Sequence, residues 1–247
     1  MNRKKIPPQE KDMQSGARSS VRGFADEEAD SICRLIQADS LEAVNSSLSE
    51  LGRIDLRLVS SRKELLLWDE IIERYHYLGY TPLPGARVRY FAFAVSRREP
   101  GGETKWRLLA LLGFNSGAWM VAARDNFIGW TNEQRKRNLR FVLNNARFLI
   151  LPWVKIDNLA SRILSLTVKQ VKKHWKEKYG YEPVLLETFV ERKRFRGTCY
   201  RAANWIHVGE TKVHWRLSKK RARPKSVKEM FVYPLSKCFR QILCREN

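Results

Sequence analysis

Helix-type and strand-type segments alternate from residue 61 onward, and this alternation restricts the possible folds more than any other feature of the sequence. The predicted order is a helix, two strands of a hairpin, a helix, a strand, a second long helix and a strand. A short helix at about 198–204 and a strand at 205–210 follow. This order predicts an α/β fold with a mixed sheet flanked by helices, and it does not resemble a tandem repeat.

The first half of this pattern has clear boundary signals. Ser60 or Ser61 can cap a helix over 61–78, and Gly79 is a natural stop. Strands are predicted over 87–95 and 106–113, because both runs are rich in β-branched, aromatic and aliphatic residues and are separated by a Pro-Gly-Gly turn.

The second half begins with a capping box at Thr131–Gln134. It predicts a helix that extends through Leu143, with a strand at 148–151. Asp157 or Asn158 can cap the next helix, which runs to Gly180, and a buried strand is expected over 183–190.

Four regions are expected on composition and periodicity. Residues 1–23 are predicted to be a disordered tail, because they lack enough apolar side chains to offset chain entropy. Apolar residues at helical intervals predict an N-terminal helical extension over 24–58. The α/β core is assigned to 59–211, and a basic C-terminal arm with a docking strand and helix to 212–247.

Positive charge dominates the chain after residue 60. The formal net charge is +21, although residues 1–60 hold only 9 basic side chains against 10 acidic ones. Proteins this basic usually bind polyanions. We therefore expect nucleic acid as the partner, and DNA rather than RNA. The N-terminus has no apolar signal segment and no stretch is long enough for a membrane span, which favours a cytoplasmic protein without a membrane partner.

Six segments carry a family resemblance: RYHYLGY (74–80), ARDNFIGWT (123–131), NNARFLILPWV (144–154), NLASRIL (158–164), LLETFVERKRFRGTCYRAANWIHVG (185–209) and FVYPL (231–235). In this order they resemble the family of Druantia protein A (DruA). The resemblance covers roughly 60–240 and implies a role in the Druantia anti-phage defence system, with other defence subunits as partners. Similar segments also occur with bacterial transposases. The chain departs from the family at 212–223, where a Gly/Arg-rich stretch is usual.

The order of helices and strands also resembles the GNAT acyltransferase fold, more weakly. In that fold a turn before a helix binds a pyrophosphate through bare backbone amides, and the corresponding residues here would be Lys155–Ala160. Asn158 replaces the first glycine and Asp157 adds a carboxylate, which disfavours an anionic cofactor. We therefore expect no acyl-CoA and no other cofactor, with Mg²⁺ only if the protein is a nuclease.

Three carboxylates near the family segments are weak catalytic candidates: Asp125, Glu187 and Glu191. Paired carboxylates can hold Mg²⁺ for phosphodiester chemistry, whereas an acidic residue beside a strand is more often paired with arginine. The four histidines have no metal-site spacing, so no metal ligand is assigned. Cys199 could act as a nucleophile with His207 or His76, but a buried thiol is the simpler interpretation, and free thiols are expected throughout.

Basic residues interleaved with aromatic ones form the strongest functional pattern. Such a surface can neutralise phosphates while aromatic rings stack on bases of an opened strand; the alternative is an ordinary solvated surface. The candidate nucleic-acid-binding residues are Arg192, Arg194, Arg196, Arg201, Lys212, Arg216, Lys219, Lys220, Arg221 and Arg223.

A second polar group comprises Asn144, Asn145 and Arg147, expected at a helix end, together with Asn158. These side chains could contact bases or phosphates, or could simply cap helices. Three classes of function stay open at this point: a DNA-binding component, an enzyme acting on nucleic acid (a nuclease or a GNAT-fold transferase), and a protein-interaction module.

Overall fold

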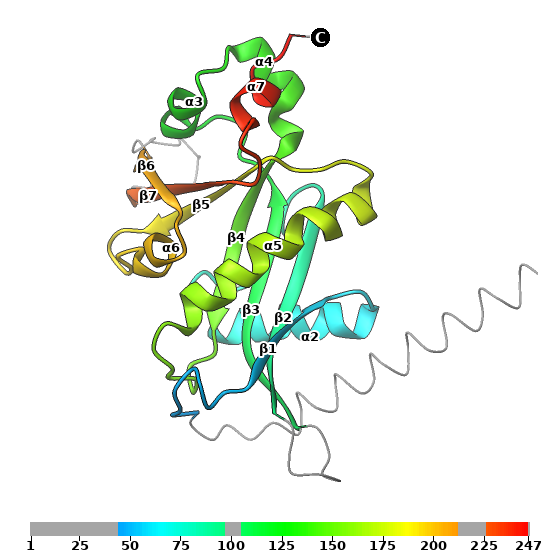
Figure 1. The fold of residues 1–247 in the computed structure, drawn as a ribbon, viewed down its shortest axis with the longest axis vertical. Helices are drawn as coiled ribbons and strands as arrows, with labels where there is room; N and C mark the ends of the chain where they lie inside the picture. Colours follow the sequence, from blue (N-terminus) through cyan, green and yellow to red (C-terminus); the bar gives the residue numbers. More distant parts are fainter. Residues whose placement is uncertain (1–43, 97–104, 212–225, 247) are drawn as a thin grey trace, which may run out of the picture.

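The structure is a computed structural model, and it describes residues 44–96, 105–211 and 226–246. Within these residues a seven-stranded sheet has the order β1-β2-β3-β4-β5-β7-β6 (Figure 1). Neighbouring strands are antiparallel except for β4 and β5, which are parallel. The mixed sheet flanked by helices that the sequence predicted is therefore confirmed.

The strands are β1 (Arg53–Leu58), β2 (Arg87–Ser96), β3 (Lys105–Ser116), β4 (Val142–Ile150), β5 (Leu185–Glu191), β6 (Ile206–Glu210) and β7 (Lys228–Pro234). The helices are α2 (Arg62–Tyr75), α3 (Ala122–Ile128), α4 (Asn132–Asn138), the 3-10 turn η1 (Leu139–Phe141), α5 (Leu159–Tyr179), α6 (Thr198–Ala202) and α7 (Phe239–Leu243). No helix among the described residues is both long and apolar enough to cross a membrane.

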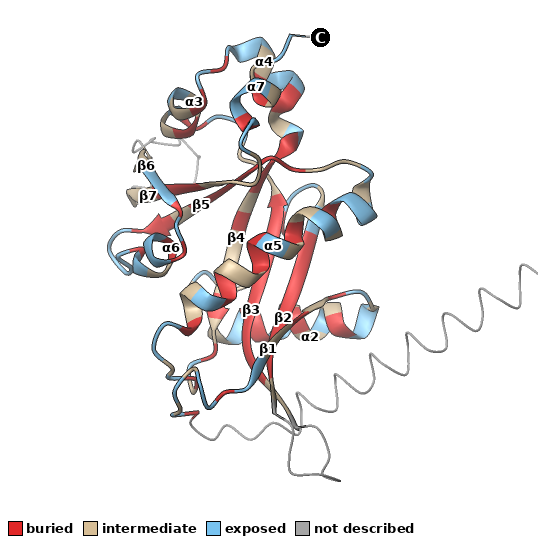
Figure 2. Ribbon diagram, in the orientation of Figure 1, coloured by how far each residue is buried: buried red, intermediate tan, exposed pale blue. Residues whose placement is uncertain are grey.

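Two helices cover the faces of the sheet formed by β1 to β4. α5 crosses in front of these strands and α2 lies behind them (Figure 1). Both contribute buried tryptophans, Trp175 from α5 and Trp68 from α2. The strands between them are buried along most of their length (Figure 2), so the main core lies on both sides of the central sheet.

β4 and β5 run together only at their start. The register pairs Val142 with Leu185 and ends at Asn144 opposite Glu187. Beyond these residues β4 stays paired with β3, with a bulge beside Gly113, while β5 pairs with β7. The two parallel strands therefore diverge, which leaves backbone groups on their facing edges unpaired with each other.

A second, smaller core closes the other end of the molecule. α3, α4 and α7 gather there (Figure 1), and the rings of Phe127 and Phe239 stack with centroids 5.8 Å apart. Asn138 donates to the carbonyl of Leu243 at 3.0 Å, which ties α4 to the C-terminal helix. The docking strand and helix expected near the C-terminus correspond to β7 and α7.

The helical extension expected over 24–58 is wrong for the part that the structure describes. Val44 forms a β-bridge with Val154, Leu48–Glu50 form a turn, and 53–58 form strand β1. The segment RIDLRL alternates polar and apolar side chains with a period of two, and it pairs with β2 along its whole length. Residues 1–43, which include the predicted tail, lie outside the described residues.

The helix expected to extend through Leu143 is also wrong. The capping box at Thr131 is present, but α4 ends at Asn138 and strand β4 begins at Val142. Asn144, Asn145 and Arg147 therefore lie within a strand, not at a helix end. Long-range pairing with β3 and β5 overrides the local helical pattern here. Helix α3 was not predicted at all.

Candidate functional site

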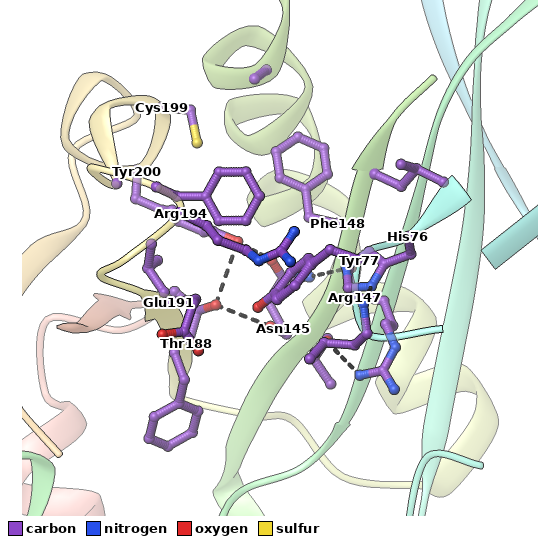
Figure 3. A pocket seen from close by; sticks show the side chains of 18 of the residues that line it. His76, Tyr77, Asn145, Arg147, Phe148, Thr188, Glu191, Arg194, Cys199 and Tyr200 are labelled. Carbon is purple, nitrogen blue, oxygen red and sulfur yellow. Dashed lines mark hydrogen bonds between the residues drawn. The ribbon is translucent and has the colours of Figure 1, made fainter. Parts of the chain in front are cut away.

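A cavity of about 660 Å³ occupies the space between the diverging strands. Its walls come mainly from four places: the end of α2, β4, β5, and the segment from β5 into α6 (Figure 3). Its described lining contains four basic side chains against one carboxylate, and these are Arg147, Arg194, Arg196, Lys228 and Glu191. The cavity is thus a positively charged site of the size that proteins use for small ligands.

A buried hydrogen-bond network fixes one wall. The Tyr200 hydroxyl donates to Asn145 Oδ1 at 2.8 Å, and the Thr188 hydroxyl donates to the Asn145 carbonyl at 3.0 Å (Figure 3). Asn145 Nδ2 donates to the carbonyl oxygens of Gly113 and Arg147. Because burial raises the pKa of Tyr200, this phenol stays protonated and donates throughout the physiological range.

Glu191 ends β5 and is the one carboxylate of the cavity's described lining. It is 8% exposed, and Ser226 donates a hydrogen bond to its Oε2. Oε1 is buried and has no hydrogen-bond partner among the described residues. Asn144 Oδ1 and Arg147 Nε, which belong to two other lining residues, are also buried and have no hydrogen-bond partner among the described residues.

Aromatic side chains and an arginine surround the mouth. The rings of Tyr77 and Phe195 meet edge to face with centroids 5.2 Å apart, and the Arg194 guanidinium lies 5.2 Å from the Tyr77 ring centre. Burial and the negative charge of Glu191 raise the pKa of Tyr77, against the opposing charges of Arg147 and Arg194. Phe195 is 48% exposed, so its ring is accessible from solvent at the mouth.

His76 lies deeper in the same wall. Its burial, together with the positive charge of Arg147, lowers the pKa of His76 to about 4. The ring is therefore neutral at pH 7, and its Nδ1 accepts a hydrogen bond from the backbone of Leu78 at 3.3 Å. Burial also lowers the pKa of Arg147 from its ordinary value.

A short loop after β5 presents the basic side chains of the mouth. The backbone amides of Arg194 and Phe195 both donate to the carbonyl of Glu191, at 3.0 and 2.9 Å. Gly197 ends the loop with φ +65°, and a Cβ there would lie 2.6 Å from the Phe231 ring. Only glycine meets both requirements, so the loop has one well-defined path.

The predicted nucleic-acid-binding residues divide into three groups. Arg192 is paired with Glu210 at 2.6 Å, and Arg201 with Glu229 at 3.3 Å. Arg194 and Arg196 line the cavity and have no carboxylate partner among the described residues. The remaining candidates, Lys212, Arg216, Lys219, Lys220, Arg221 and Arg223, lie outside the described residues.

Two of the three candidate carboxylates, Asp125 and Glu187, contact the same side chain, but that side chain is an arginine. Arg124 is fully buried and contacts Glu187 and Asp125, each at 2.8 Å. Glu187 also accepts from the Ala118 amide, and Asp125 accepts from Trp130 Nε1. Glu191 lies apart from this pair and lines the cavity. Burial raises the pKa of Glu187, whereas its contact with Arg124 acts in the opposite direction.

Asn158 is the N-cap residue immediately before α5; it has the left-handed conformation, with φ 61°, and its side chain makes no capping hydrogen bond. A second cavity of about 270 Å³ adjoins this helix end and is also lined by Cys199. Burial raises the pKa of the Cys199 thiol, which favours the protonated form. Cys199, Cys238 and Cys244, the described cysteines, are free thiols.

Sequence reasoning missed Tyr77, Phe148 and Lys228, which all line the cavity. No motif or spacing links these positions, because the site forms only where β4 and β5 diverge.

The described part of the chain thus combines a mixed α/β sheet with a cavity that has aromatic walls and a basic mouth. The model of one family, described as Druantia protein DruA, matches residues 18–218, and the chain belongs to that family. The family places the chain with the Druantia anti-phage defence system. Four of the segments that carry the resemblance, 74–80, 144–154, 158–164 and 185–209, contribute residues to the cavity lining.

A comparison with curated proteins finds no match. Similar solved structures include a ribosomal-protein-S18-alanine N-acetyltransferase from Escherichia coli, with 8% identity over 74% of this chain and 95% of that one and a TM-score of 0.40. A ribosomal-protein-S5-alanine acetyltransferase from Vibrio fischeri has 6% identity over 74% and 94%, with a TM-score of 0.43. A spermidine N-acetyltransferase from Vibrio cholerae has 10% identity over 74% and 95%, with a TM-score of 0.42. At these values the likeness says nothing about the activity of this chain.

Proposed function

We propose that this chain is the nucleic-acid-binding component of a Druantia system, and that it binds DNA in preference to RNA. The bound strand passes over the loop of residues 192–197. The observation that carries the proposal is the pair Arg194 and Arg196 at the mouth of the cavity. Both are exposed, and neither has a carboxylate partner among the described residues. Unpaired guanidinium groups on a fixed loop are well suited to phosphates.

The exposed ring of Phe195 lies between these two arginines in the chain. Basic groups that neutralise phosphates, alternating with an aromatic ring that can stack on a base, are the usual elements of a single-strand binding surface. The net charge of +21 adds a long-range attraction for the same partner. The segment 212–223 belongs to the proposed surface by its sequence alone.

The test is a binding titration of the full chain against labelled single-stranded and double-stranded DNA and RNA across a salt series. We expect submicromolar binding at low salt, and a log–log dependence of the binding constant on salt whose slope is steeper than about −2. Polyacrylate at equal charge concentration serves as the control polyanion. The proposal would be contradicted if polyacrylate competed for binding as effectively as unlabelled strand and the chain showed no preference among the four nucleic acids.

A transferase that uses an acyl-CoA is the second candidate. The observation that favours it is the divergence of β4 and β5, which opens a cavity that continues towards the start of α5 through residues such as Ile150 and Cys199. Asp157 beside that helix end argues against an anionic cofactor. Saturable retention of acetyl-CoA by the protein in equilibrium dialysis would support the transferase, and no retention at millimolar acetyl-CoA would contradict it.

The nuclease alternative has less support, because Asp125 and Glu187 are ion-paired with Arg124, and Asp125 also with Arg135. Within the described residues no group of three histidine, cysteine or carboxylate side chains could hold a metal ion. The interaction-module alternative depends on residues 26–51, most of which lie outside the described part of the chain, and on the terminal apolar segment. In that segment Phe239 and Leu243 are buried in the smaller core. Other defence subunits remain proposed partners in either case.

A further inference from the structure

The loop between β3 and α3 is held at both of its ends by the buried charges around Arg124. The Ala118 amide donates to Glu187 Oε1 at 2.6 Å, and Arg124 donates to the Ala118 carbonyl at 2.7 Å. At the other end, the Val121 amide donates to Asp125 Oδ2 at 3.2 Å. Charge-assisted hydrogen bonds therefore restrain the backbone on both sides of the two residues in between.

These two residues are Trp119 and Met120, and their exposed fractions are 57% and 68%. The Arg135 guanidinium lies 5.8 Å from the centre of the Trp119 ring, and it is itself paired with Asp125 at 3.3 Å. The Trp119 ring is thus open to solvent on a restrained loop. Such a ring loses little conformational freedom when a partner packs on it.

Glu187, which bonds this loop, faces the same side of β5 as the cavity. Alternate side chains of a strand share a face, so Glu187, Phe189 and Glu191 point to one side of the sheet. Phe189 and Glu191 line the cavity, and so does Asn144, which is opposite Glu187 in the register. The cavity therefore reaches the strand position that anchors the loop of Trp119.

The length of this face of β5 fits a short stretch of nucleic acid. From Glu187 to Glu191 the strand rises about 13 Å, at about 3.3 Å per residue. Stacked nucleotides rise about 3.4 Å each, so roughly four of them span this length. The loop of residues 192–197 follows Glu191 directly. A strand that passes over that loop and continues along β5 would reach Trp119.

Charge favours nucleic acid over protein as the partner of Trp119. Tryptophan is also common at the centre of protein interfaces, so the ring alone does not choose between them. The described lining of the adjoining cavity, however, holds four basic side chains against one carboxylate, which suits a polyanion. Aromatic rings next to basic groups are the pattern by which proteins bind single strands.

We infer that Trp119 stacks on a base of the bound strand, and that the strand runs along this face of β5 between the loop of residues 192–197 and Trp119. This inference deepens the proposed function and rests on it. It also gives the buried ion pairs of Arg124 a purpose, since they hold the loop that carries the stacking ring.

The test measures binding of the full chain to a twelve-nucleotide oligo(dT) and to an abasic strand of the same length, which keeps the phosphates and sugars but has no bases. Trp119→Ala should weaken binding to oligo(dT) about tenfold, which is within the usual range for the loss of one stacked base. It should bind the abasic strand as tightly as the wild type does. Trp119→Phe keeps an aromatic ring and should retain most of the affinity.

The matched control is Leu66→Ala, which removes another exposed apolar side chain, 62% exposed on α2, that does not line the cavity. It should match the wild type on both strands. Equal affinity of Trp119→Ala and wild type for oligo(dT) would overturn the inference in favour of a protein partner, while leaving the proposed function intact. A loss of the same size on the abasic strand would also overturn it, because stacking needs a base. Absence of binding to either strand by the wild type would instead overturn the proposed function, and the inference with it.

Discussion

Tyr200 and Asn145 are joined by a hydrogen bond of 2.8 Å from the phenol to the amide oxygen, although 55 positions separate them in the chain. The bond connects α6 to β4 across the inner end of the cavity. Since Thr188 of β5 donates to the Asn145 carbonyl as well, Asn145 holds the two diverging strands at a fixed separation. The cavity is therefore part of the folded framework rather than a gap between loosely packed elements.

Removing the Tyr200 hydroxyl tests this network. Tyr200→Phe keeps the ring, which stacks on Phe231, but leaves Asn145 Oδ1 buried without its donor. We expect the free energy of unfolding in urea to fall by about 1–3 kcal/mol. Tyr179→Phe is the control, because its hydroxyl bonds Arg87 at an exposed site and should cost less than about 1 kcal/mol. Equal decreases in the two variants would show that the network adds no special stability.

The loop that carries Arg194 depends on Gly197. Gly197→Ala adds a Cβ at φ +65° that would lie 2.6 Å from Phe231, so we expect destabilisation of about 2–4 kcal/mol. Gly180→Ala is a matched control, because Gly180 also has a positive φ, +79°, but its Cβ would meet nothing within 4 Å. That variant should be destabilised by only about 1 kcal/mol. Thermal unfolding of the two variants measures the difference, and similar destabilisation would remove the role assigned to Phe231.

Stability should fall as the pH drops from about 6.5 to about 4, because of His76. Its pKa is lowered to about 4 in the folded protein from an ordinary value of 6.5, so the unfolded chain binds the proton more tightly across this interval. The contribution is complete above pH 6.5 and disappears as the pH falls towards 4, amounting to at most about 3 kcal/mol.

Urea unfolding of the wild type and of His76→Gln at pH 7.5, 6.5, 5.5 and 4.5 checks this expectation. The variant should have the shallower pH dependence, with the remaining slope due to carboxylates and to His174, whose pKa burial also lowers. Identical slopes in both proteins would contradict the assignment to His76.

The elements that the sequence predicted well have local signals at their ends. Ser61 and Glu64 form the capping box that starts α2, and Gly180 ends α5 in the left-handed conformation that favours glycine. The elements that it missed depend on distant partners. β1 exists because it pairs with β2, and β4 begins at Val142 because β3 and β5 flank it.

The site follows the same rule. Arg194 and Arg196 were recognised because a one-sided run of charge is visible in a single segment. Tyr77 and Lys228 were not, because they reach the cavity from distant parts of the chain. The polar character of Asn145 was visible, but its role was not, since it depends on a tyrosine that only the fold brings near.

The most direct test of the proposed binding surface at residues 192–197 is the salt dependence of DNA binding by two variants of equal net charge. R194Q/R196Q removes two exposed guanidinium groups from the cavity mouth, and K169Q/K173Q removes two exposed ammonium groups from α5. We predict that R194Q/R196Q weakens single-strand binding and lowers the magnitude of the salt slope by about 1.4, because each neutralised phosphate of a single strand adds about 0.7 to the slope. K169Q/K173Q should match the wild type. Equal slopes for all three proteins would contradict the placement of the strand at this loop.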